Sequence, residues 1–332
     1  DWIDALKASI NELKNRNASA VASLQAIGIA GHMHGATLLD KNGEILHPCI
    51  LWNDTRSYKQ ASILDKEENL REITGNIVFP GFTAPKLLWI QDNKPELFEQ
   101  VAKVLLPASY LGYYLTGEFF MDMSDAAGTS WLDVGNRCWS EYALKASNMR
   151  SDQMPKLLEG TQVASSVSEF IADELGIPSG VSVVAGAGDN AAAACGVGIT
   201  KEGQGFVSIG TSGVLLTARD TYTPLAHSAV HTFCHAIPKT WYQMGVILSA
   251  TDSLNWLSSI TGKSPKELSE GLGHKINGPS FEKFYPYLSG ERTPLNDAHI
   301  RGGFSGLSTN SNRMKLTQAV LEGVAFALCD CL

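Results

Sequence analysis

The segment Val181-Ser-Val-Val-Ala-Gly-Ala-Gly-Asp-Asn190 decides the fold of this chain. Its first five residues are almost wholly apolar, which is typical of a strand buried in a parallel or mixed sheet. The glycine-rich turn of residues 186–188 then leads into an alanine-rich helix over 191–195 that stops at Gly196. A buried strand that runs directly into a helix predicts an α/β fold, in which ligands gather at strand ends.

Strands and helices alternate in two blocks around this segment. The first block predicts a meander of strands over 21–30, 36–39 and 45–51, with turns at 31–35 and Asn42-Gly43. It continues with helices over 58–73, 85–91, 95–101, 109–115 (Ser109 as N-cap) and 165–175. The second block predicts strands over 205–209, 214–217, 231–236 and 241–248, then helices over 252–260, 265–270 and 313–332. This order predicts two α/β lobes, residues 1–200 and 201–332.

The composition is typical of a well-packed protein. The residues are 44% hydrophobic and 18% charged, which excludes disorder for most of the chain. The length of 332 residues suggests two domains, or one large and one partial domain. Lys and Arg number 26 and Asp and Glu 34, so the net charge of −8 argues against a nucleic-acid or anionic-membrane surface. No apolar run approaches the roughly 18 residues that span a bilayer. The six scattered cysteines indicate reduced thiols, and therefore a cytoplasmic protein.

Both ends of the sequence predict that the chain is part of a longer protein. A helix pattern opens at Asp1 with no preceding cap or strand, and the last helix pattern reaches Leu332 without a stop signal. Cys329 and Cys331 fall in that last pattern, so we expect helix residues there rather than a metal clamp.

The first candidate site is the turn Ser208-Ile-Gly-Thr-Ser-Gly213. Glycines around two hydroxyl residues at a strand turn let backbone N–H groups approach an anion, so the turn could hold a phosphate. The alternative is an ordinary glycine hairpin.

The second candidate is Asp189, which follows the buried strand and opens the alanine-rich helix. A carboxylate at a strand end could act as a general base that takes a hydroxyl proton. The alternative is a structural N-cap, a position that favours Asp. The residues alone favour the cap, but Asp189 and the glycine turn flank the predicted lobe boundary.

The histidines form the third group. His32 and His34 lie two apart in a turn, and His227, His231 and His235 are spaced by four, so a zinc site is one reading. His231 and His235 fall in an alternating strand pattern with no evident Cys or carboxylate partner, and we therefore predict no metal site. His34, on a loop between strands, is more simply a hydrogen-bonding partner of a polar ligand or an exposed turn residue.

Two polar segments leave similar alternatives open. Residues 52–56, Trp-Asn-Asp-Thr-Arg, place an aromatic ring beside polar groups suited to hydroxyls, or form a helix start capped by Asp54 or Thr55. Residues 290–294, Gly-Glu-Arg-Thr-Pro, form a ligand contact or a salt-bridged loop.

Taken together, these motifs resemble the FGGY carbohydrate kinases, and most closely the branch that phosphorylates xylulose. The segment Gly81-Phe-Thr-Ala-Pro-Lys-Leu-Leu-Trp-Ile-Gln-Asp-Asn93 is similar to the first family signature. Residues 302–307 and 316–322 resemble the second, although Lys315 stands where an acid or amide is expected. Residues 33–35, 51–54, 124–129, 188–190 and 287–294 also resemble family segments, so the likeness covers essentially the whole chain.

The resemblance implies an actin-like (ribonuclease H-like) α/β fold with two lobes, mixed sheets and an incomplete second lobe. It implies phosphorylation of D-xylulose at its terminal hydroxyl with ATP and Mg²⁺, and a possible homodimer. Asp189 would be the base, and Met33, His34, Asp189 and Asn190 would hold the ketose. Gly210, Thr211, Ser212 and Gly213 would face the ATP phosphates, and Thr251 and Asn255 the nucleotide.

The sequence also departs from the family pattern. The family begins with a strand and an Asp-x-Gly-Thr-type phosphate turn and ends with a glycine-rich adenosine-binding segment, and neither occurs between Asp1 and Leu332. We therefore expect the 332 residues alone to have little kinase activity. The alternatives are a kinase for L-ribulose, glycerol or gluconate, a non-catalytic sugar-binding protein on the same scaffold, and a metal-dependent hydrolase that uses the histidines.

Overall fold

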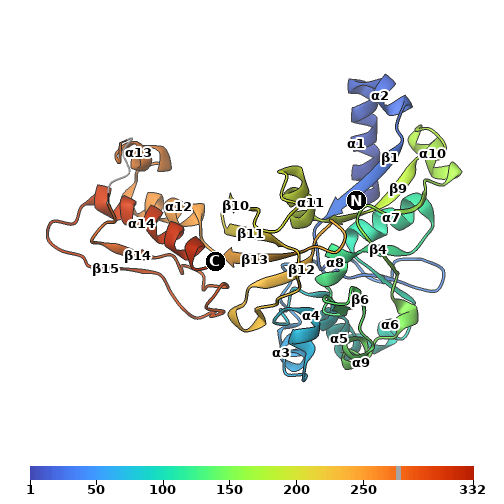
Figure 1. The fold of residues 1–332 in the computed structure, drawn as a ribbon, viewed down its shortest axis with the longest axis horizontal. Helices are drawn as coiled ribbons and strands as arrows, with labels where there is room; N and C mark the ends of the chain where they lie inside the picture. The colour runs from blue at the N-terminus through green and yellow to red at the C-terminus, as the bar shows by residue number, and fades with distance from the viewer. Residues whose placement is uncertain (274–277) are drawn as a thin grey trace. The chain divides into compact units, whose positions relative to one another are not determined.

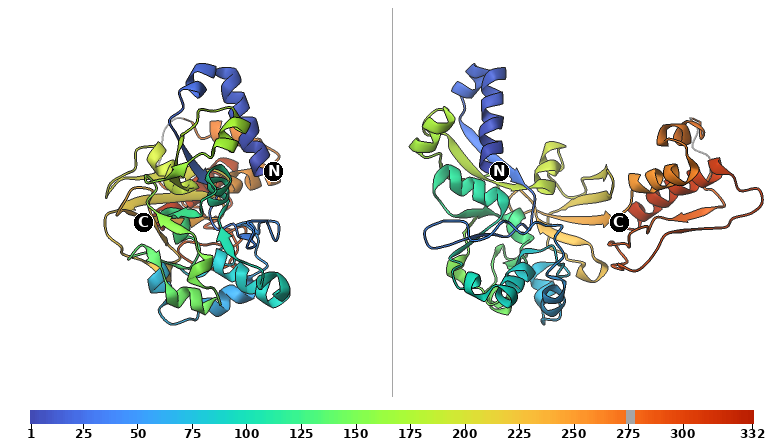
Figure 2. Two further views of the ribbon diagram at one scale, coloured as in Figure 1. Left: turned by 90° about the vertical axis from the view of Figure 1, so that its right-hand side faces the viewer. Right: turned by 180° about the vertical axis from the view of Figure 1, so that it is seen from behind.

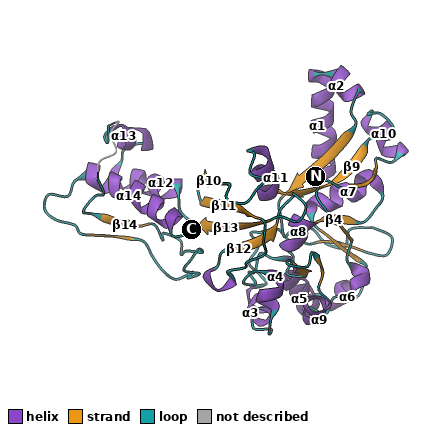
Figure 3. Cartoon of the chain, in the orientation of Figure 1, coloured by secondary structure: helices purple, strands orange, loops and turns teal. Residues whose placement is uncertain are grey.

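The computed structural model describes residues 1–273 and 278–332. Its contacts divide the chain into two compact units. Unit 1 contains residues 1–201, 219–223 and 233–242, and unit 2 contains residues 202–218, 224–232 and 243–332. Helices and strands alternate in both units (Figures 1 and 3). No helix among the described residues is both long enough and apolar enough to cross a membrane.

Unit 1 is a mixed α/β structure. Its elements are α1 (Trp2–Arg16), α2 (Ala18–Ala22), β1 (Ala26–Gly31), β2 (Thr37–Leu39), α3 (Tyr58–Leu64), α4 (Leu70–Thr74), α5 (Thr83–Asn93), α6 (Pro95–Phe98), β3 (Lys103–Leu105), α7 (Pro107–Thr116), β4 (Phe120–Asp122), α8 (Met123–Ala127), β5 (Leu132–Asp133), β6 (Cys138–Trp139), α9 (Glu141–Ala146), the 3₁₀ turn η1 (Ser151–Gln153), β7 (Lys156–Leu158), β8 (Val163–Ser166), α10 (Glu169–Leu175), β9 (Ser182–Gly188) and α11 (Asp189–Gly196). Its main sheet has the order β1-β9-β8, with β1 parallel and β8 antiparallel to β9. Three two-stranded sheets, β2-β3, β4-β7 and β5-β6, complete the unit.

The second half of the chain carries a four-stranded sheet followed by helices. Its elements are β10 (Gly205–Ile209), β11 (Gly213–Arg219), the 3₁₀ turn η2 (Ala226–Ser228), β12 (His231–Cys234), β13 (Trp241–Ile247), α12 (Thr251–Thr261), α13 (Pro265–Glu270), β14 (Lys283–Tyr285), β15 (Gly303–Ser305) and α14 (Arg313–Cys329). The sheet order is β10-β11-β13-β12, and β14 pairs with β15. Strands β11, β12 and β13 contribute residues to both units.

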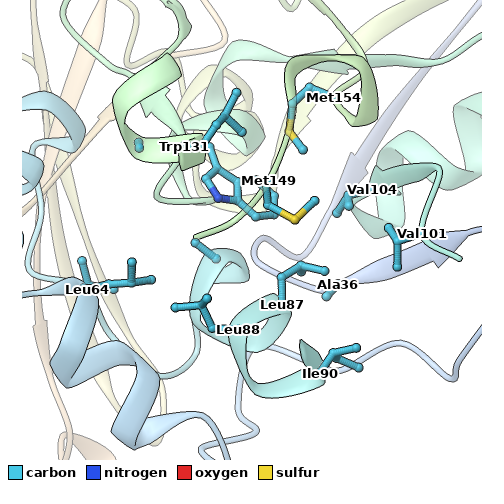
Figure 4. Packing of buried hydrophobic residues seen from close by; sticks show 14 of the residues in the cluster. Ala36, Leu64, Leu87, Leu88, Ile90, Val101, Val104, Trp131, Met149 and Met154 are labelled. Atoms are coloured by element: carbon cyan, nitrogen blue, oxygen red, sulfur yellow. The ribbon is translucent and has the colours of Figure 1, made fainter. Parts of the chain in front are cut away.

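Two apolar clusters hold unit 1 together. One lies along the main sheet and joins buried residues of α7, α10 and β9, among them Leu115, Ile171 and Val183. The helices α1, α7 and α10 lie around this sheet (Figures 1 and 2). The other cluster packs α5 against its neighbours through Leu87, Ile90 and Trp131 (Figure 4). Apolar burial therefore anchors β9 and most of α5 in the core of unit 1.

The predicted first meander is correct only in part. Strands form over Ala26–Gly31 and Thr37–Leu39, and an antiparallel bridge joins Leu39 to Ile45 across the predicted turn at Asn42-Gly43, but residues 21–25 are not a strand. Residues 21 and 22 belong to α2, which begins where the Asn17 side chain accepts a hydrogen bond from the Ala20 N–H at 3.1 Å. Strand β1 then pairs in parallel with β9, and β2 pairs with β3. Residues 45–51 make only isolated bridges to β2 and its flank, because Pro48 has no N–H to continue a ladder.

Three helix predictions also need correction. The helix over 58–73 is two helices, α3 and α4, separated where Asn69 adopts a left-handed conformation (φ 65°). The segment 165–175 begins as strand β8, and its helix is capped by Ser168, whose hydroxyl accepts from the Ile171 N–H at 3.4 Å. Helix α7 begins at Pro107 rather than at Ser109, since proline suits the first helical position.

Candidate active site

Two adjacent parallel strands of unit 1 end side by side. Gly31 at the end of β1 pairs with Gly188 at the end of β9. The carboxyl ends of parallel strands lie at the same edge of a sheet, so the residues that follow them come together. Met33 and His34 follow β1, and Asp189 and Asn190 follow β9 directly. The parallel pairing therefore brings the four predicted ketose-binding residues to one edge.

Met33 forms a buried contact surface at this edge. Its side chain is 4% exposed, and its Sδ accepts a hydrogen bond from the Tyr242 hydroxyl at 3.7 Å. A Cβ atom added to Gly188 would lie 3.0 Å from Cγ of Met33 and 3.2 Å from Oδ1 of Asp125. Glycine at position 188 therefore lets β9 end in close contact with both side chains.

The His34 ring is held on two sides. Its Nδ1 lies 2.7 Å from the Gly128 carbonyl oxygen, and the ring stacks on Phe82 with centroids 4.5 Å apart and planes 17° apart. A carbonyl oxygen accepts hydrogen bonds and cannot donate them, so Nδ1 carries a proton. In the neutral imidazole Nε2 is then a hydrogen-bond acceptor, suited to a hydroxyl group.

Asp189 is the first residue of α11. The N-cap of this helix is Gly188, which makes no side-chain cap bond, so the prediction of Asp189 as a structural N-cap is wrong. The carboxylate is exposed, and Oδ1 accepts from the backbone N–H of Asn190 at 2.7 Å and from its Nδ2 at 2.9 Å. For Oδ2 the part of the chain that the structure describes supplies no hydrogen-bond donor. One carboxylate oxygen is therefore oriented by two donors, and the other has no donor among the described residues.

Residues 122–125 are linked to the end of β9 by hydrogen bonds. Oδ1 of Asp122 accepts from the backbone N–H groups of Ser124 at 2.8 Å and Asp125 at 3.0 Å, and from the Ser124 hydroxyl. The Ser124 Oγ in turn accepts from the Gly188 N–H at 2.9 Å. This chain of bonds fixes the main chain directly before Asp189.

Asp125 has no partner of this kind. Its side chain is fully buried, and neither carboxyl oxygen has a hydrogen-bond partner among residues 1–273 and 278–332. Burial raises its pKa well above the usual range, and the charges of Asp122 and Asp189 raise it further. Residues 124–129 resemble a family segment, but the sequence alone gives Asp125 no role, because no local pattern indicates that its side chain is buried.

The glycine turn lies in unit 2, between β10 and β11. The Gly210 N–H donates to the Ser212 carbonyl at 2.9 Å, and Ile209 pairs with Gly213 across the hairpin. Thr211 and Ser212 are exposed, and their N–H groups have no acceptor within the described residues. The turn is thus a hairpin, as one of the two alternatives predicts, and it also has two main-chain donors without an acceptor among the described residues.

The carbonyl side of the turn is attached to α12. The Gly210 oxygen accepts from the Thr251 N–H at 3.0 Å and from its hydroxyl at 2.7 Å, and the Thr211 oxygen accepts from the Ala250 N–H at 2.8 Å. Thr251 therefore holds the turn in place. Asn255, one helical turn later, is exposed.

The remaining predicted motifs have structural explanations. Asp54 pairs with Arg56, whose guanidinium lies 5.0 Å from the Trp89 ring, and Ser57 rather than Asp54 or Thr55 is the N-cap of α3. Glu291 is buried and accepts from the Leu248 N–H at 3.0 Å, which ties the loop of residues 290–294 to β13.

The histidines that the sequence analysis singled out, and the cysteines, lie within the described residues. The Nδ1 of His235 accepts from the Ile237 N–H at 3.2 Å. Over the described ranges no group of three or more His, Cys, Asp or Glu side chains could hold a metal ion. All six cysteines are free, and Cys329 ends helix α14.

Comparison with known proteins gives the class. Residues 1–196 match the N-terminal domain of the FGGY family of carbohydrate kinases, and residues 205–332 match its C-terminal domain. The chain therefore belongs to the FGGY family of carbohydrate kinases. The expected actin-like α/β fold class is thereby confirmed, because solved structures of this family superpose on almost the whole chain.

Individual relatives narrow the likeness. The chain is 45% identical over 331 residues to a xylulose kinase from Escherichia coli, covering 99% of this chain and 68% of the relative. It is 40% identical to a xylulose kinase from Lactococcus lactis, of which it covers 66%. A crystal structure of a xylulose kinase from Brucella ovis matches with a TM-score of 0.97 and 53% identity, over 99% of this chain and 68% of that one. The chain thus spans about two thirds of the length of these relatives.

Proposed function

We propose that this chain forms the greater part of an ATP-dependent xylulose kinase, which phosphorylates the terminal hydroxyl of D-xylulose to give D-xylulose 5-phosphate. The observation that carries the proposal is the meeting of two strand ends: Gly31 pairs with Gly188, so His34 and Asp189 stand at one edge of the sheet. The names of the relatives, among them seven xylulose kinases at 35–46% identity, suggest the sugar.

Each of the four predicted ketose-binding residues would have a different role. Oδ2 of Asp189 would take the proton of the attacking hydroxyl while the Asn190 bonds hold Oδ1 in place. The Nε2 atom of His34 would accept a hydrogen bond from a sugar hydroxyl, and the Asn190 amide would bind another. Met33, being buried, would contribute through its backbone and through the shape of the loop.

On the phosphate side, the main chain would do most of the binding. The outward N–H groups of Thr211 and Ser212, between Gly210 and Gly213, would donate to phosphate oxygens. Thr251 would position this turn, and Asn255 would lie toward the nucleotide. Phosphoryl transfer has a loose transition state, so positioning and charge stabilisation supply most of the rate.

FGGY kinases use ATP with a divalent metal, for which Mg²⁺ is our proposal. The described residues do not form a metal site of three or more side-chain ligands, so no step is derived through the ion. The six free cysteines are typical of a reducing compartment, and we therefore place the enzyme in the cytoplasm. A homodimer stays a prediction.

A substrate panel tests this proposal. Full-length enzyme with ATP and Mg²⁺ is assayed by coupled ADP release on D-xylulose, L-ribulose, glycerol and gluconate. Gluconate belongs in the panel because a gluconate kinase from Lactobacillus acidophilus also matches the chain, with a TM-score of 0.90. We expect kcat/KM for D-xylulose to exceed each of the others by about tenfold or more. A higher value for another substrate, or sugar binding without turnover, would overturn the assignment.

A further inference from the structure

A buried lysine lies directly beneath the sugar-side loop. Lys86, in the first turn of α5, is 0% exposed, and its Nζ donates a hydrogen bond to the His34 carbonyl oxygen at 2.8 Å. Burial lowers the pKa of Lys86 to about 7, while nearby Cys49 and Asp54 act in the opposite direction. Burying an ammonium group costs free energy that an apolar side chain of the same length would not cost. This lysine therefore calls for an explanation other than packing.

The same carbonyl has a second donor. The Thr83 hydroxyl, at the start of α5, lies 3.2 Å from the His34 oxygen. Two side chains from the first turn of α5 thus donate hydrogen bonds to the same main-chain oxygen. His34 itself has φ of 72°, a left-handed conformation that is unfavourable for a residue with a side chain. The two donors stabilise a conformation that the loop would otherwise leave.

The ring of His34 depends on that conformation. With the main chain held from α5, the ring stacks on Phe82, the N-cap of the same helix, and its Nδ1 reaches the Gly128 oxygen at 2.7 Å. A Cβ atom added to Gly128 would lie 2.6 Å from the ring, so this close approach of the two segments requires glycine at position 128. If the carbonyl swung away, the ring would lose the stack and the Gly128 bond together.

We propose that Lys86 is a positioning residue for sugar recognition, whose side-chain amino group fixes the His34 main chain so that the imidazole presents Nε2 to the substrate. The proposal rests on the proposed function, since it needs His34 to bind the ketose. Lys86 would not touch the sugar, because its side chain is fully buried beneath the loop. Its influence would therefore appear in sugar affinity and pass through the His34 side chain.

The test is a set of variants of the full-length enzyme with separate KM values for D-xylulose and ATP. Lys86→Met keeps the length of the side chain and removes the donor. We expect it to raise KM for D-xylulose about tenfold while KM for ATP changes less than about twofold. Lys94→Met is the matched control, because Lys94 is an exposed lysine just beyond the other end of α5. It should leave both values unchanged.

A double-mutant cycle separates positioning from general damage. In a His34→Ala background, Lys86→Met should have almost no further effect on KM for D-xylulose, because the ring that it positions is gone. Additive effects of the two substitutions would overturn the proposal, as would a folded Lys86→Met enzyme with wild-type KM for the sugar.

A variant at Thr83 covers the case in which Lys86→Met is unstable. If Lys86→Met does not fold, Thr83→Val removes the second donor without unpairing a charge, and it should raise KM for D-xylulose by a smaller factor, about threefold. An unchanged KM for D-xylulose in folded Thr83→Val would then contradict a role for the hydrogen bonds to the His34 carbonyl oxygen. Failure of the proposed function is distinguishable, since the wild-type enzyme itself would then not turn over D-xylulose.

Discussion

The loop after β1 and the turn after β10 are built in opposite ways. In the loop, the proposed sugar site is made of side chains: His34 is stacked on Phe82, and its carbonyl oxygen accepts a hydrogen bond from Lys86. In the turn, the proposed phosphate site is made of the main chain: Thr211 and Ser212 are exposed, and their N–H groups have no acceptor within the described residues. This difference predicts how substitutions affect each region. Side-chain substitutions should damage sugar recognition, whereas the phosphate turn should tolerate them.

The largest effect is expected at Asp189, which lies at the start of α11 and outside both the loop and the turn. Asp189→Ala removes the proposed base, so kcat should fall by about 10³-fold or more while D-xylulose affinity falls only a few-fold. Coupled ADP release and calorimetry measure the two quantities. Asp173→Asn, an exposed acid in α10, is the control and should keep full turnover. Normal kcat in Asp189→Ala would remove the base assignment.

A smaller effect is expected in the phosphate turn. Thr211→Ala and Ser212→Ala leave the backbone N–H groups in place, so KM for ATP should rise by no more than about threefold, with KM for D-xylulose unchanged. Initial-rate kinetics at varied ATP measure this. A rise of a hundredfold in either variant would mean that the hydroxyls, rather than the main chain, hold the phosphates, and the contrast between the two regions would fail.

The smallest effect concerns stability and pH at Asp125. Its pKa is raised in the folded protein, so the folded state keeps a proton that the unfolded state loses. The stability contributed by Asp125 is therefore present below its unfolded pKa, near 4, and is lost as the pH rises toward the raised folded value. Urea unfolding from pH 4.5 to 7 should show the full-length wild type losing stability relative to Asp125→Asn, by at most about 1.4 kcal/mol per pH unit. Parallel curves for the two proteins would contradict a protonated Asp125.

Local signals in the sequence predicted part of this fold well. The boundaries of α13 were predictable because Ser264 and Glu267 form a reciprocal cap and Pro265 follows. The hairpin of β10 and β11 was predictable because its glycine turn is a local feature. The pairing of β1 with β9 was not, since parallel partners lie far apart in the sequence and the nearer segments also alternate like strands.

The candidate site divides in the same way. His34 and Asp189 could be singled out because loops and strand ends are where ligands bind. Lys86 and Asp125 gained no role, because their importance depends on burial and on partners distant in the chain. One signal for Lys86 was available: it is a cation on a helix whose neighbours Ala84, Leu87 and Ile90 are apolar.

The central claim is that the edge formed by the ends of β1 and β9 binds the sugar. Calorimetric titration tests it most directly, with D-xylulose and ADP added separately to full-length wild type and His34→Ala. Our account predicts a Kd for D-xylulose about tenfold higher in His34→Ala and a Kd for ADP within about twofold of wild type. Equal D-xylulose affinity in the two proteins, with the variant folded, would contradict it.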